Sequence, residues 1–289
     1  MKVLITGSEG FIGTRVKSIL KQNKIDTISY DIKNSNDILD EQTLEANIKN
    51  VDIILHIAAQ ANLLEMEDIA GAKQGVDFNV DGTHKICYLC SKHKKKLIYA
   101  STVCVYGNIR HKAVENCLLN PSELYAFSKL AGELLVKGYS LNFDLKYIIL
   151  RFATTYGPGM RPALGTSVFF KQALASNNIT VHGNGKQTRT LTYVDDIALG
   201  CLNAIKYFDT AANNTFNISN TEKISALKMA KDIKQITKSK SDIVFIKQRN
   251  NQTFHENICI RKAYKLLKWK PRYSWRKGLR ETYKWLVNS

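Results

Sequence analysis

Hydrophobic residues along the chain fall into short runs that predict β-strands, and longer stretches of helical periodicity separate these runs. The predicted strands are KVLIT (2–6), DTISY (26–30), VDIILHI (51–57), KLIYA (96–100), LKYIILR (145–151) and TFNIS (215–219). The predicted helices span 11–22, 73–93, 123–140, 221–237 and 261–268. Short apolar strands that alternate with helices are typical of a parallel sheet covered by helices on both faces. We therefore predict an α/β fold with a doubly wound parallel sheet.

The pattern becomes less regular after about residue 165, which predicts a second, smaller part of the fold. We assign residues 1–165 to the sheet domain, and we expect residues 195–220, which contain the last apolar strand, to return to it. Residues 166–194 and 221–289 then form a smaller C-terminal α/β portion.

The composition favours a folded cytoplasmic protein. The chain has 289 residues with 44% hydrophobic content, enough for a sizeable core. Its longest apolar runs, such as VDIILHIAA, are too short to cross a bilayer. The opening MKVLITG is a predicted strand and turn, which leaves no room for a signal peptide.

The cysteines do not indicate a metal site. Six cysteines at irregular spacing in a chain of this length do not predict a disulfide framework. In HKICYLCSKH, His84, Cys87, Cys90 and His93 follow one another at intervals of three residues. On a helix these side chains spread over half the cylinder and cannot enclose one zinc ion, so we expect no metal.

The net charge of +17 leaves several partners open: nucleic acid, an acidic membrane surface or small anionic substrates. The basic residues are scattered along the chain, which favours a general compositional bias in Lys, Asn and Ile. We therefore expect no nucleic acid and no membrane insertion.

Three glycines in KVLITGSEGFIG follow the first strand and precede the first helix. Gly7 permits a tight turn, Gly10 lets the backbone approach a pyrophosphate, and Gly13 lets helix and strand pack closely. Asp31 ends the next strand, where a carboxylate binds the ribose diol and repels a 2′-phosphate. We therefore predict a Rossmann-type NAD-binding domain over 1–165, with a preference for NAD(H) that the nearby Lys33 makes moderate.

The stretch SELYAFSKLAGE places Tyr125 and Lys129 on one face of a helix, roughly 6 Å apart at Cβ. Thr102 follows the fourth strand, at the edge where ligands bind in open α/β sheets. Two unit charges about 4 Å apart interact by roughly 4 kcal/mol at an effective dielectric of 20, which is worth about 3 pK units. We predict that Tyr125 is the base for a substrate hydroxyl, that Lys129 lowers its pKa and contacts the nicotinamide ribose, and that Thr102 orients the hydroxyl.

The chain resembles the extended short-chain dehydrogenases/reductases of the nucleotide-sugar epimerase/dehydratase type. The resemblance covers nearly the whole length, through TGSEGFIG, HIAAQ, FNVDGT, STVCVYG, YAFSK, LRFATTYGPGMRP, GNGKQTRTLTYVDDIA and LLKWKPRYSWRKGLRETYKW. It implies tightly held NAD and a nucleotide-diphosphate sugar bound by the smaller portion. It also implies a homodimer through the helices near 73–93 and 123–140.

The resemblance assigns further residues by position. It implies cofactor contacts by Phe11 and Ile12 in the glycine turn, Asp37 and Ile38 at the adenine, Ala58 and Ala59, and Asn79, which supports the third strand and the cofactor loop. Arg189 and Arg249 fall where family arginines clamp the diphosphate. The run around Arg249, RNNQTFHENI, departs from the family pattern.

The residues after Thr102 narrow the reaction that the resemblance implies. Members that eliminate water or decarboxylate carry carboxylates there, whereas this chain has Val103 and Cys104. What remains is oxidation at C4, rotation of the 4-keto sugar and return of the hydride to the other face. Three alternatives stay open. One is a 3,5-epimerase/4-reductase that uses Cys104, the second is a net dehydrogenase/reductase, and the third is an RNA-binding protein of this fold.

Thr154 and Arg161, seven residues apart in LRFATTYGPGMRP, bear on the substrate. Threonine and Arg-Pro at these positions resemble UDP-glucuronate 4-epimerases, in which they hold the sugar carboxylate. An arginine fork suits a carboxylate. Related neutral-sugar enzymes also carry the Arg-Pro, so the prediction covers a UDP-hexose or a UDP-hexuronate and leans slightly to the acid.

Overall fold

A single parallel sheet forms the centre of the computed structural model, which describes residues 1–61, 69–248 and 255–288. Its six strands lie in the order β10-β5-β4-β3-β1-β2, and all neighbouring pairs are parallel. The strands are β1 (Lys2–Thr6), β2 (Asp26–Tyr30), β3 (Ile53–His56), β4 (Lys96–Thr102), β5 (Tyr147–Phe152) and β10 (Asn214–Ile218). The predicted α/β class with a doubly wound parallel sheet is confirmed.

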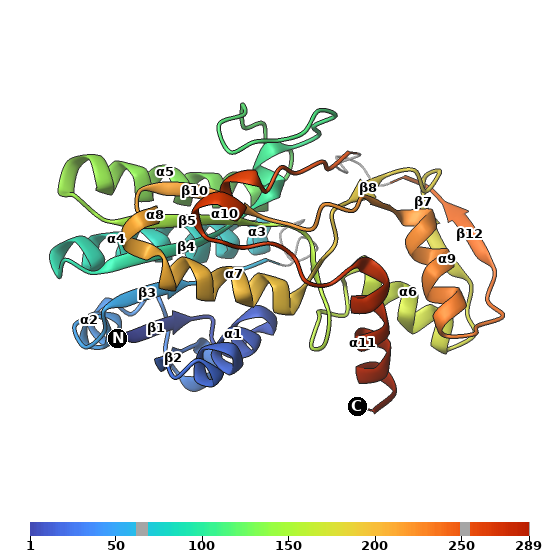
Figure 1. The fold of residues 1–289 in the computed structure, drawn as a ribbon, viewed down its shortest axis with the longest axis horizontal. Helices are drawn as coiled ribbons and strands as arrows, with labels where there is room; N and C mark the ends of the chain where they lie inside the picture. Colours follow the sequence, from blue (N-terminus) through green and yellow to red (C-terminus); the bar gives the residue numbers. More distant parts are fainter. Residues whose placement is uncertain (62–68, 249–254, 289) are drawn as a thin grey trace.

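Helices cover both faces of this sheet (Figure 1). On one face, α1 (Phe11–Gln22) and α7 (Val194–Lys206) pack against strand residues such as Val3, Ile5 and Leu55. On the other face, α2 (Glu41–Ile48), α4 (Gly82–Lys92) and α5 (Leu124–Phe143) pack against Leu4 and Ile54. Adjacent strand residues thus serve opposite cores, as expected for strands buried on both sides.

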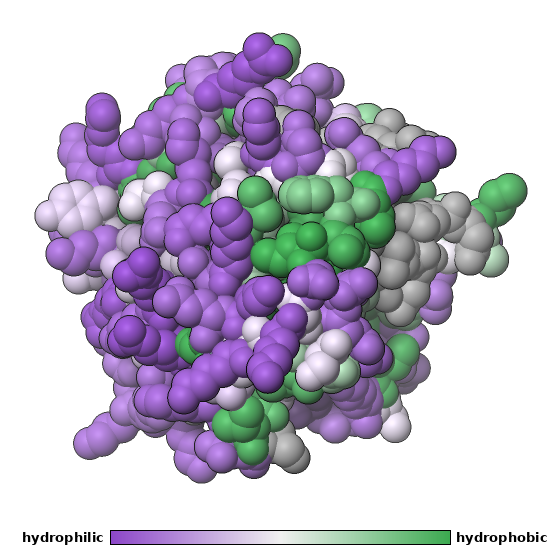
Figure 2. Space-filling view, turned by 90° about the vertical axis from the view of Figure 1, so that its right-hand side faces the viewer, coloured by the Kyte–Doolittle hydropathy of each residue, from purple (hydrophilic) through white to green (hydrophobic). Residues whose placement is uncertain are grey.

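The smaller part is built from short strand pairs and three helices. The pairs are β6 (Thr155–Tyr156) with β9 (Thr192–Tyr193), β7 (Ile179–His182) with β12 (Ile243–Ile246), and β8 (Thr188–Arg189) with β11 (Ile224–Ser225). The helices α6 (Gly165–Leu174), α9 (Ala226–Ile236) and α11 (Trp275–Asn288) pack around a separate core that includes Phe170 and Trp275. Figure 2 shows the side of the molecule that carries β12, which is mostly polar, with an apolar patch near the centre and smaller apolar groups toward the edges.

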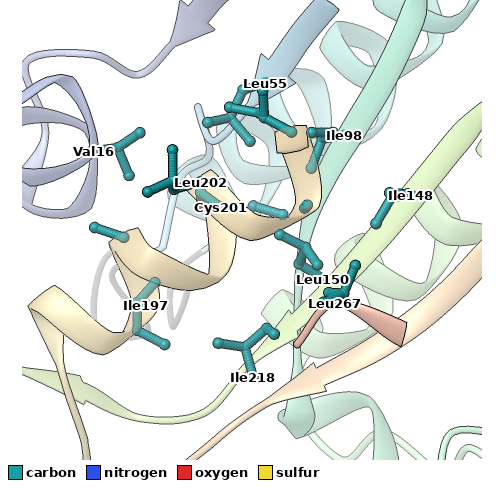
Figure 3. Packing of buried hydrophobic residues seen from close by; sticks show 14 of the residues in the cluster. Val16, Leu55, Ile98, Ile148, Leu150, Ile197, Cys201, Leu202, Ile218 and Leu267 are labelled. Carbon is teal, nitrogen blue, oxygen red and sulfur yellow. The ribbon is translucent and has the colours of Figure 1, made fainter. Parts of the chain in front are cut away.

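The C-terminal third of the chain contributes to the main core as well. Strand β10 and helix α7 join the sheet domain, and α8 (Phe208–Ala211) lies between them in the sequence. After α9 the chain returns to the sheet domain, where Leu267, directly after α10 (Arg261–Leu266), packs in the sheet core (Figure 3). Trp269 is buried in the same core. The Trp269 indole N–H donates to the Asp196 carbonyl at 2.9 Å. This packing differs from the expected placement of all of 221–289 in the smaller portion.

The predicted helix over 73–93 is interrupted in the structure. It consists of α3 (Ile69–Val76), a π-helical turn (Asp77–Asp81) and α4. The wide turn holds Asn79, whose side chain is buried and bonded to two other segments. Among the described residues, no helix is long and apolar enough to span a membrane.

Candidate active site

The glycine turn after β1 is packed too closely to admit side chains. Gly7 has φ +73°, and a Cβ added there would lie 2.7 Å from the Ala58 nitrogen. A Cβ at Gly13 would lie 2.0 Å from the Gly7 carbonyl oxygen. The predicted roles of these two glycines, a tight turn and close helix–strand packing, agree with this geometry.

Helix α1 begins at this turn without a capping side chain. Its N-cap is Gly10, which provides no side-chain cap, and the first turn contains no acidic residue. A helix start of this kind offers several N–H donors and the positive end of the helix dipole to an anion. Phe11 packs toward the smaller part and Ile12 toward the sheet core, so the helix start lies where the two parts meet.

The carboxylate at the end of β2 has a fixed orientation. Asp31 is 8% exposed; its Oδ2 accepts from the Glu9 N–H at 2.9 Å and its Oδ1 from the Lys33 N–H at 3.0 Å. The Lys33 ammonium donates to the Glu9 carbonyl at 3.3 Å. Asp31 therefore lies beside the glycine turn, where a ribose diol would follow a pyrophosphate.

The other predicted cofactor residues lie around the same edge. Asp37 Oδ1 accepts from the Leu39 N–H at 2.9 Å, whereas Ile38 is buried and packs against Gly82. The Ala58 N–H donates to the Thr6 carbonyl at 3.0 Å, and Ala59 follows it. The close glycine cradle, the uncapped helix start and the oriented Asp31 together fit a dinucleotide.

Asn79 links the loop after β3 to helix α5. Its Oδ1 accepts from the Gln60 N–H at 2.8 Å, and its Nδ2 donates to the Gln60 carbonyl at 3.0 Å and to the Ser128 hydroxyl at 2.9 Å. This is the supporting position that the family resemblance implies for Asn79.

Thr102, Tyr125 and Lys129 come from neighbouring elements. Thr102 ends β4 and is 6% exposed; its Oγ1 accepts from the Cys104 N–H at 3.2 Å, which begins a 3₁₀ turn (Val103–Tyr106). Tyr125 and Lys129 lie in the first turns of α5. Lys129 is 2% exposed, and its ammonium lies 4.2 Å from the centre of the Tyr99 ring.

Burial dominates the electrostatics of this pair. It raises the pKa of the Tyr125 phenol, and it lowers the pKa of Lys129 to about 7 against the opposing effect of Glu133. The predicted lowering of the Tyr125 pKa by Lys129 is therefore not found in the protein alone, because desolvation of the phenol has the larger effect. Arg161 acts in the lowering direction on the Tyr125 pKa.

The low pKa of Lys129 predicts a pH-dependent cost in stability. In the unfolded chain this lysine stays protonated up to about pH 10.4, whereas in the fold it loses its proton near pH 7. Stability therefore rises with pH between these values. We expect Lys129→Met to stabilise the nucleotide-free protein by on the order of a few kcal/mol below pH 7, with a gain that shrinks toward pH 10. Urea unfolding of both proteins at pH 6 and pH 9.5 measures this; a gain that does not depend on pH would contradict it.

Three of the residues predicted to bind substrate, Cys104, Thr154 and Arg189, have contacts or neighbours that the structure describes. Burial raises the pKa of the Cys104 thiol to about 11, and Glu123, Glu256 and Arg189 all act on that thiol. Arg189 Nε lies 3.9 Å from Glu256 Oε2. The Thr154 carbonyl accepts from the Thr192 N–H at 2.9 Å, whereas Arg249 lies outside the described residues.

Two carboxylates in this region were not predicted. Glu256 is 6% exposed, and its Oε1 accepts from the Thr190 N–H at 2.9 Å and from the Thr190 hydroxyl. Glu123 precedes Tyr125 by two residues, and burial raises its pKa. Glu123 could have been recognised from the sequence, because it stands beside Tyr125 in SELYAFSK. Glu256 could not, because its contact with Thr190 joins residues 66 positions apart and leaves no local pattern.

A buried ion pair anchors α5 behind the site. Arg151 on β5 donates to both carboxylate oxygens of Glu133, through Nε at 2.8 Å and NH2 at 2.7 Å. Ser101, next to Thr102, donates to the same carboxylate at 2.6 Å. A bidentate pair of this kind fixes geometry more firmly than a single contact, so β4, β5 and α5 are held together behind Thr102 and Tyr125.

Comparison with known proteins places the chain in a family. Residues 3–219 match the model of the NAD dependent epimerase/dehydratase family, and the chain belongs to that family. It is 30% identical over 312 residues to an uncharacterized UDP-glucose epimerase, YtcB, of Bacillus subtilis, with 96% of each chain covered.

Solved structures agree with this assignment. A UDP-glucuronic acid 4-epimerase from Bacillus cereus, in complex with UDP-glucuronic acid and NAD, aligns with TM-score 0.93 and 28% identity over 100% of this chain and 99% of the other. A UDP-glucose 4-epimerase from Thermotoga maritima, with UDP-glucose, aligns with TM-score 0.92 and 25% identity over the same shares.

Proposed function

We propose that the protein is an NAD-dependent epimerase that inverts C4 of a nucleotide-diphosphate sugar, a UDP-hexose or a UDP-hexuronate. The observation that carries this proposal is the placement of Thr102, Tyr125 and Lys129 at the edge of the sheet that also holds the glycine turn. Positions 103 and 104 carry no carboxylate, which removes the group that elimination or decarboxylation requires. The relatives described above act on substrates of this class.

Each residue of the site has a separate role in the proposed reaction. Thr102 Oγ1 orients the C4 hydroxyl, and Tyr125 Oη takes its proton and later returns it to the opposite configuration. Bound NAD⁺ supplies the hydride acceptor and donor. Gly7, Gly10 and Gly13 would hold its pyrophosphate at the start of α1, and Asp31 would hold its adenosine ribose. Lys129 lies one turn beyond Tyr125, within reach of the second ribose.

A 3,5-epimerase that uses Cys104 is the rival reaction to test. Burial raises the pKa of the Cys104 thiol to about 11 and also raises the pKa of the Tyr125 phenol, so the pKa values of the protein alone do not separate the two reactions. A 4-epimerase moves hydride without exchange with solvent, whereas a 3,5-epimerase exchanges the C3 and C5 protons. Incubation of the substrate in D₂O separates the two reactions by deuterium at those carbons.

The central experiment follows the sugar and the cofactor together. Purified protein is incubated with UDP-glucose, UDP-galactose or UDP-glucuronate, and anomeric protons are followed by NMR. Inversion at C4 without stoichiometric absorbance at 340 nm supports the proposal. Absorbance that rises in step with product indicates a net dehydrogenase instead.

A substitution of Arg161 tests whether the substrate is a UDP-hexuronate and not a UDP-hexose. The residue lies within electrostatic reach of Tyr125 and is exposed, free to meet a C5 substituent. We expect Arg161→Ala to reduce kcat/KM for UDP-glucuronate by about tenfold or more, the scale of one lost charged hydrogen bond, and to change UDP-glucose far less. Lys171→Ala, on the outer part of α6, is the matched control. Equal losses on both sugars would mean that Arg161 does not bind a carboxylate.

We also propose a homodimer through α3, α4 and α5. Phe127, Leu134 and Leu141 recur every seven residues on α5 and are 52%, 61% and 86% exposed, so one helix face presents an apolar stripe to solvent. Such a stripe is typical of helix–helix association. We expect Leu134→Glu to convert the dimer to a monomer in sedimentation velocity. Leu118→Glu, at a leucine that is more exposed than Leu134 but lies off these helices, should leave the dimer intact. A wild-type monomer would refute the proposal.

A cytoplasmic location is part of the same proposal. All six cysteines are free, and three of them lie in the sheet cores. Free thiols in this number fit a reducing compartment.

A further inference from the structure

A buried histidine stands at the C-terminal end of β3, two residues before Ala58. His56 is 0% exposed, and each ring nitrogen has a hydroxyl partner. Nδ1 lies 2.7 Å from the Thr6 hydroxyl at the end of β1, and Nε2 lies 3.1 Å from the Thr83 hydroxyl on α4.

The surrounding bonds fix which nitrogen carries the proton. The Thr83 hydroxyl donates its one proton to the Asn79 carbonyl at 2.6 Å, so toward His56 it can only accept. His56 is therefore the Nε2–H tautomer, and its Nδ1 accepts from the Thr6 hydroxyl. Thr6 Oγ1 in turn accepts from the Ala58 N–H at 3.3 Å.

The chain of hydrogen bonds continues through Asn79 to the catalytic helix. The Asn79 amide bonds the Gln60 backbone twice and donates to Ser128, and the Ser128 hydroxyl donates to the Tyr125 carbonyl at 2.8 Å. Through His56, Thr83 and both the backbone and the side chain of Asn79, these bonds join the segment beside the glycine turn to the backbone of the tyrosine. Each side-chain polar group along them has a partner, which is the condition for a rigid buried network.

The path requires an uncharged imidazole. Burial lowers the pKa of His56 well below its usual value, and the charge of Lys129 acts in the same direction. The ring centre of Tyr99 lies 5.7 Å from that of His56 and 4.2 Å from the Lys129 ammonium. A second proton on His56 would remove the acceptor that Thr6 needs.

We propose that His56 is a positioning residue, whose neutral Nε2–H tautomer holds the cofactor turn, the loop after β3 and the start of α5 in one arrangement. It acts through Thr83 and Asn79 and touches neither substrate nor cofactor. The effect of His56 on turnover rests on the function proposed for Tyr125. The tautomer of His56 and its effect on NAD affinity can be measured independently of that function.

Variants along the path test the proposal. His56→Leu and Thr83→Val are each expected to lower kcat and NAD affinity by about tenfold with little change in KM for the sugar, and the double variant is expected to lose no more than either single one. His56→Gln, which keeps a donor and an acceptor, should recover part of the loss. His93→Gln, which alters a hydrogen bond to Glu45 away from the site, is the control and should be unaffected.

Nitrogen-15 NMR of the histidine rings supplies a readout that mere structural damage does not move. His56 is expected to show a protonated Nε2 and an unprotonated Nδ1 that do not titrate between pH 5 and 9. The opposite tautomer, a titrating ring, or additive losses in the double variant would overturn the proposal. If His56→Leu does not fold, Thr83→Val carries the kinetic test. If the wild type lacks epimerase activity, the NMR and NAD-affinity measurements still decide the question.

Discussion

Tyr125→Phe is expected to lower turnover by about 10²- to 10⁴-fold, the usual contribution of a general acid–base group, and to leave NAD binding intact. The proposed mechanism makes the Tyr125 phenol, in the first turn of α5, the acceptor for the proton of the C4 hydroxyl. Loss of its hydroxyl removes the proton acceptor but leaves the glycine turn and Asp31 unchanged. Steady-state kinetics together with the amount of bound nucleotide measure both parts.

A matched control separates chemistry from folding. Tyr147→Phe removes a phenolic hydroxyl from the start of β5, at the opposite edge of the sheet, and should leave kcat within about twofold of wild type. Near-normal turnover in Tyr125→Phe would refute the mechanism. Loss of bound NAD in the same variant would mean that the defect lies in the cofactor site.

Gly10→Ala is expected to fold but to lose NAD affinity by at least about tenfold, or about 1.4 kcal/mol. A Cβ at Gly10 meets only the Gly7 carbonyl oxygen, at 3.3 Å, which a shift of a few tenths of an ångström relieves. The new methyl group would, however, lie on the N–H groups at the start of α1 that the pyrophosphate needs. The measurement is NAD titration by calorimetry beside a thermal unfolding curve.

Two further variants on the same helix serve as controls for Gly10→Ala. Gly13→Ala should destabilise the fold itself, because its Cβ would lie 2.0 Å from the Gly7 carbonyl oxygen. Ser18→Ala, further along α1, should change neither property. Unchanged NAD affinity in Gly10→Ala would place the pyrophosphate elsewhere.

The local sequence pattern was sufficient to predict those elements whose ends are marked by turn residues. Strands β1 and β2 and helix α1 match the predicted ranges residue for residue, since turn residues flank each apolar run. Helix α2 was missed although Asp40 caps it through the Thr43 N–H at 3.3 Å, a signal present in DEQTLEANI.

Helix α7 was not predicted. Ten of its thirteen residues are buried, although its apolar positions recur with a helical period as clear as that of α1. Its two opening acids, Asp195 and Asp196, resemble a loop in sequence. In the fold they bind Arg15 and the N–H groups of Arg272 and Tyr273, all far away in the chain.

The candidate site also contains both kinds of residue, those that local pattern predicts and those that depend on distant contacts. Gly7, Gly10, Gly13 and Asp31 lie together because consecutive elements bring them to one sheet edge. The Glu256–Thr190 contact and the His56 path depend on pairs distant in sequence, for which spacing provides no signal.

The late return of the chain to the sheet core affects synthesis on the ribosome. Strand β10 completes the sheet, and Trp269 closes the core beneath it, close to the end of the 289 residues. The core of the N-terminal half is therefore complete only once Trp269 has been translated, although domains usually fold as units in order of synthesis. A nascent chain stalled before residue 214 leaves the edge of β5 unpaired, and such an unpaired edge is a template for association with other chains.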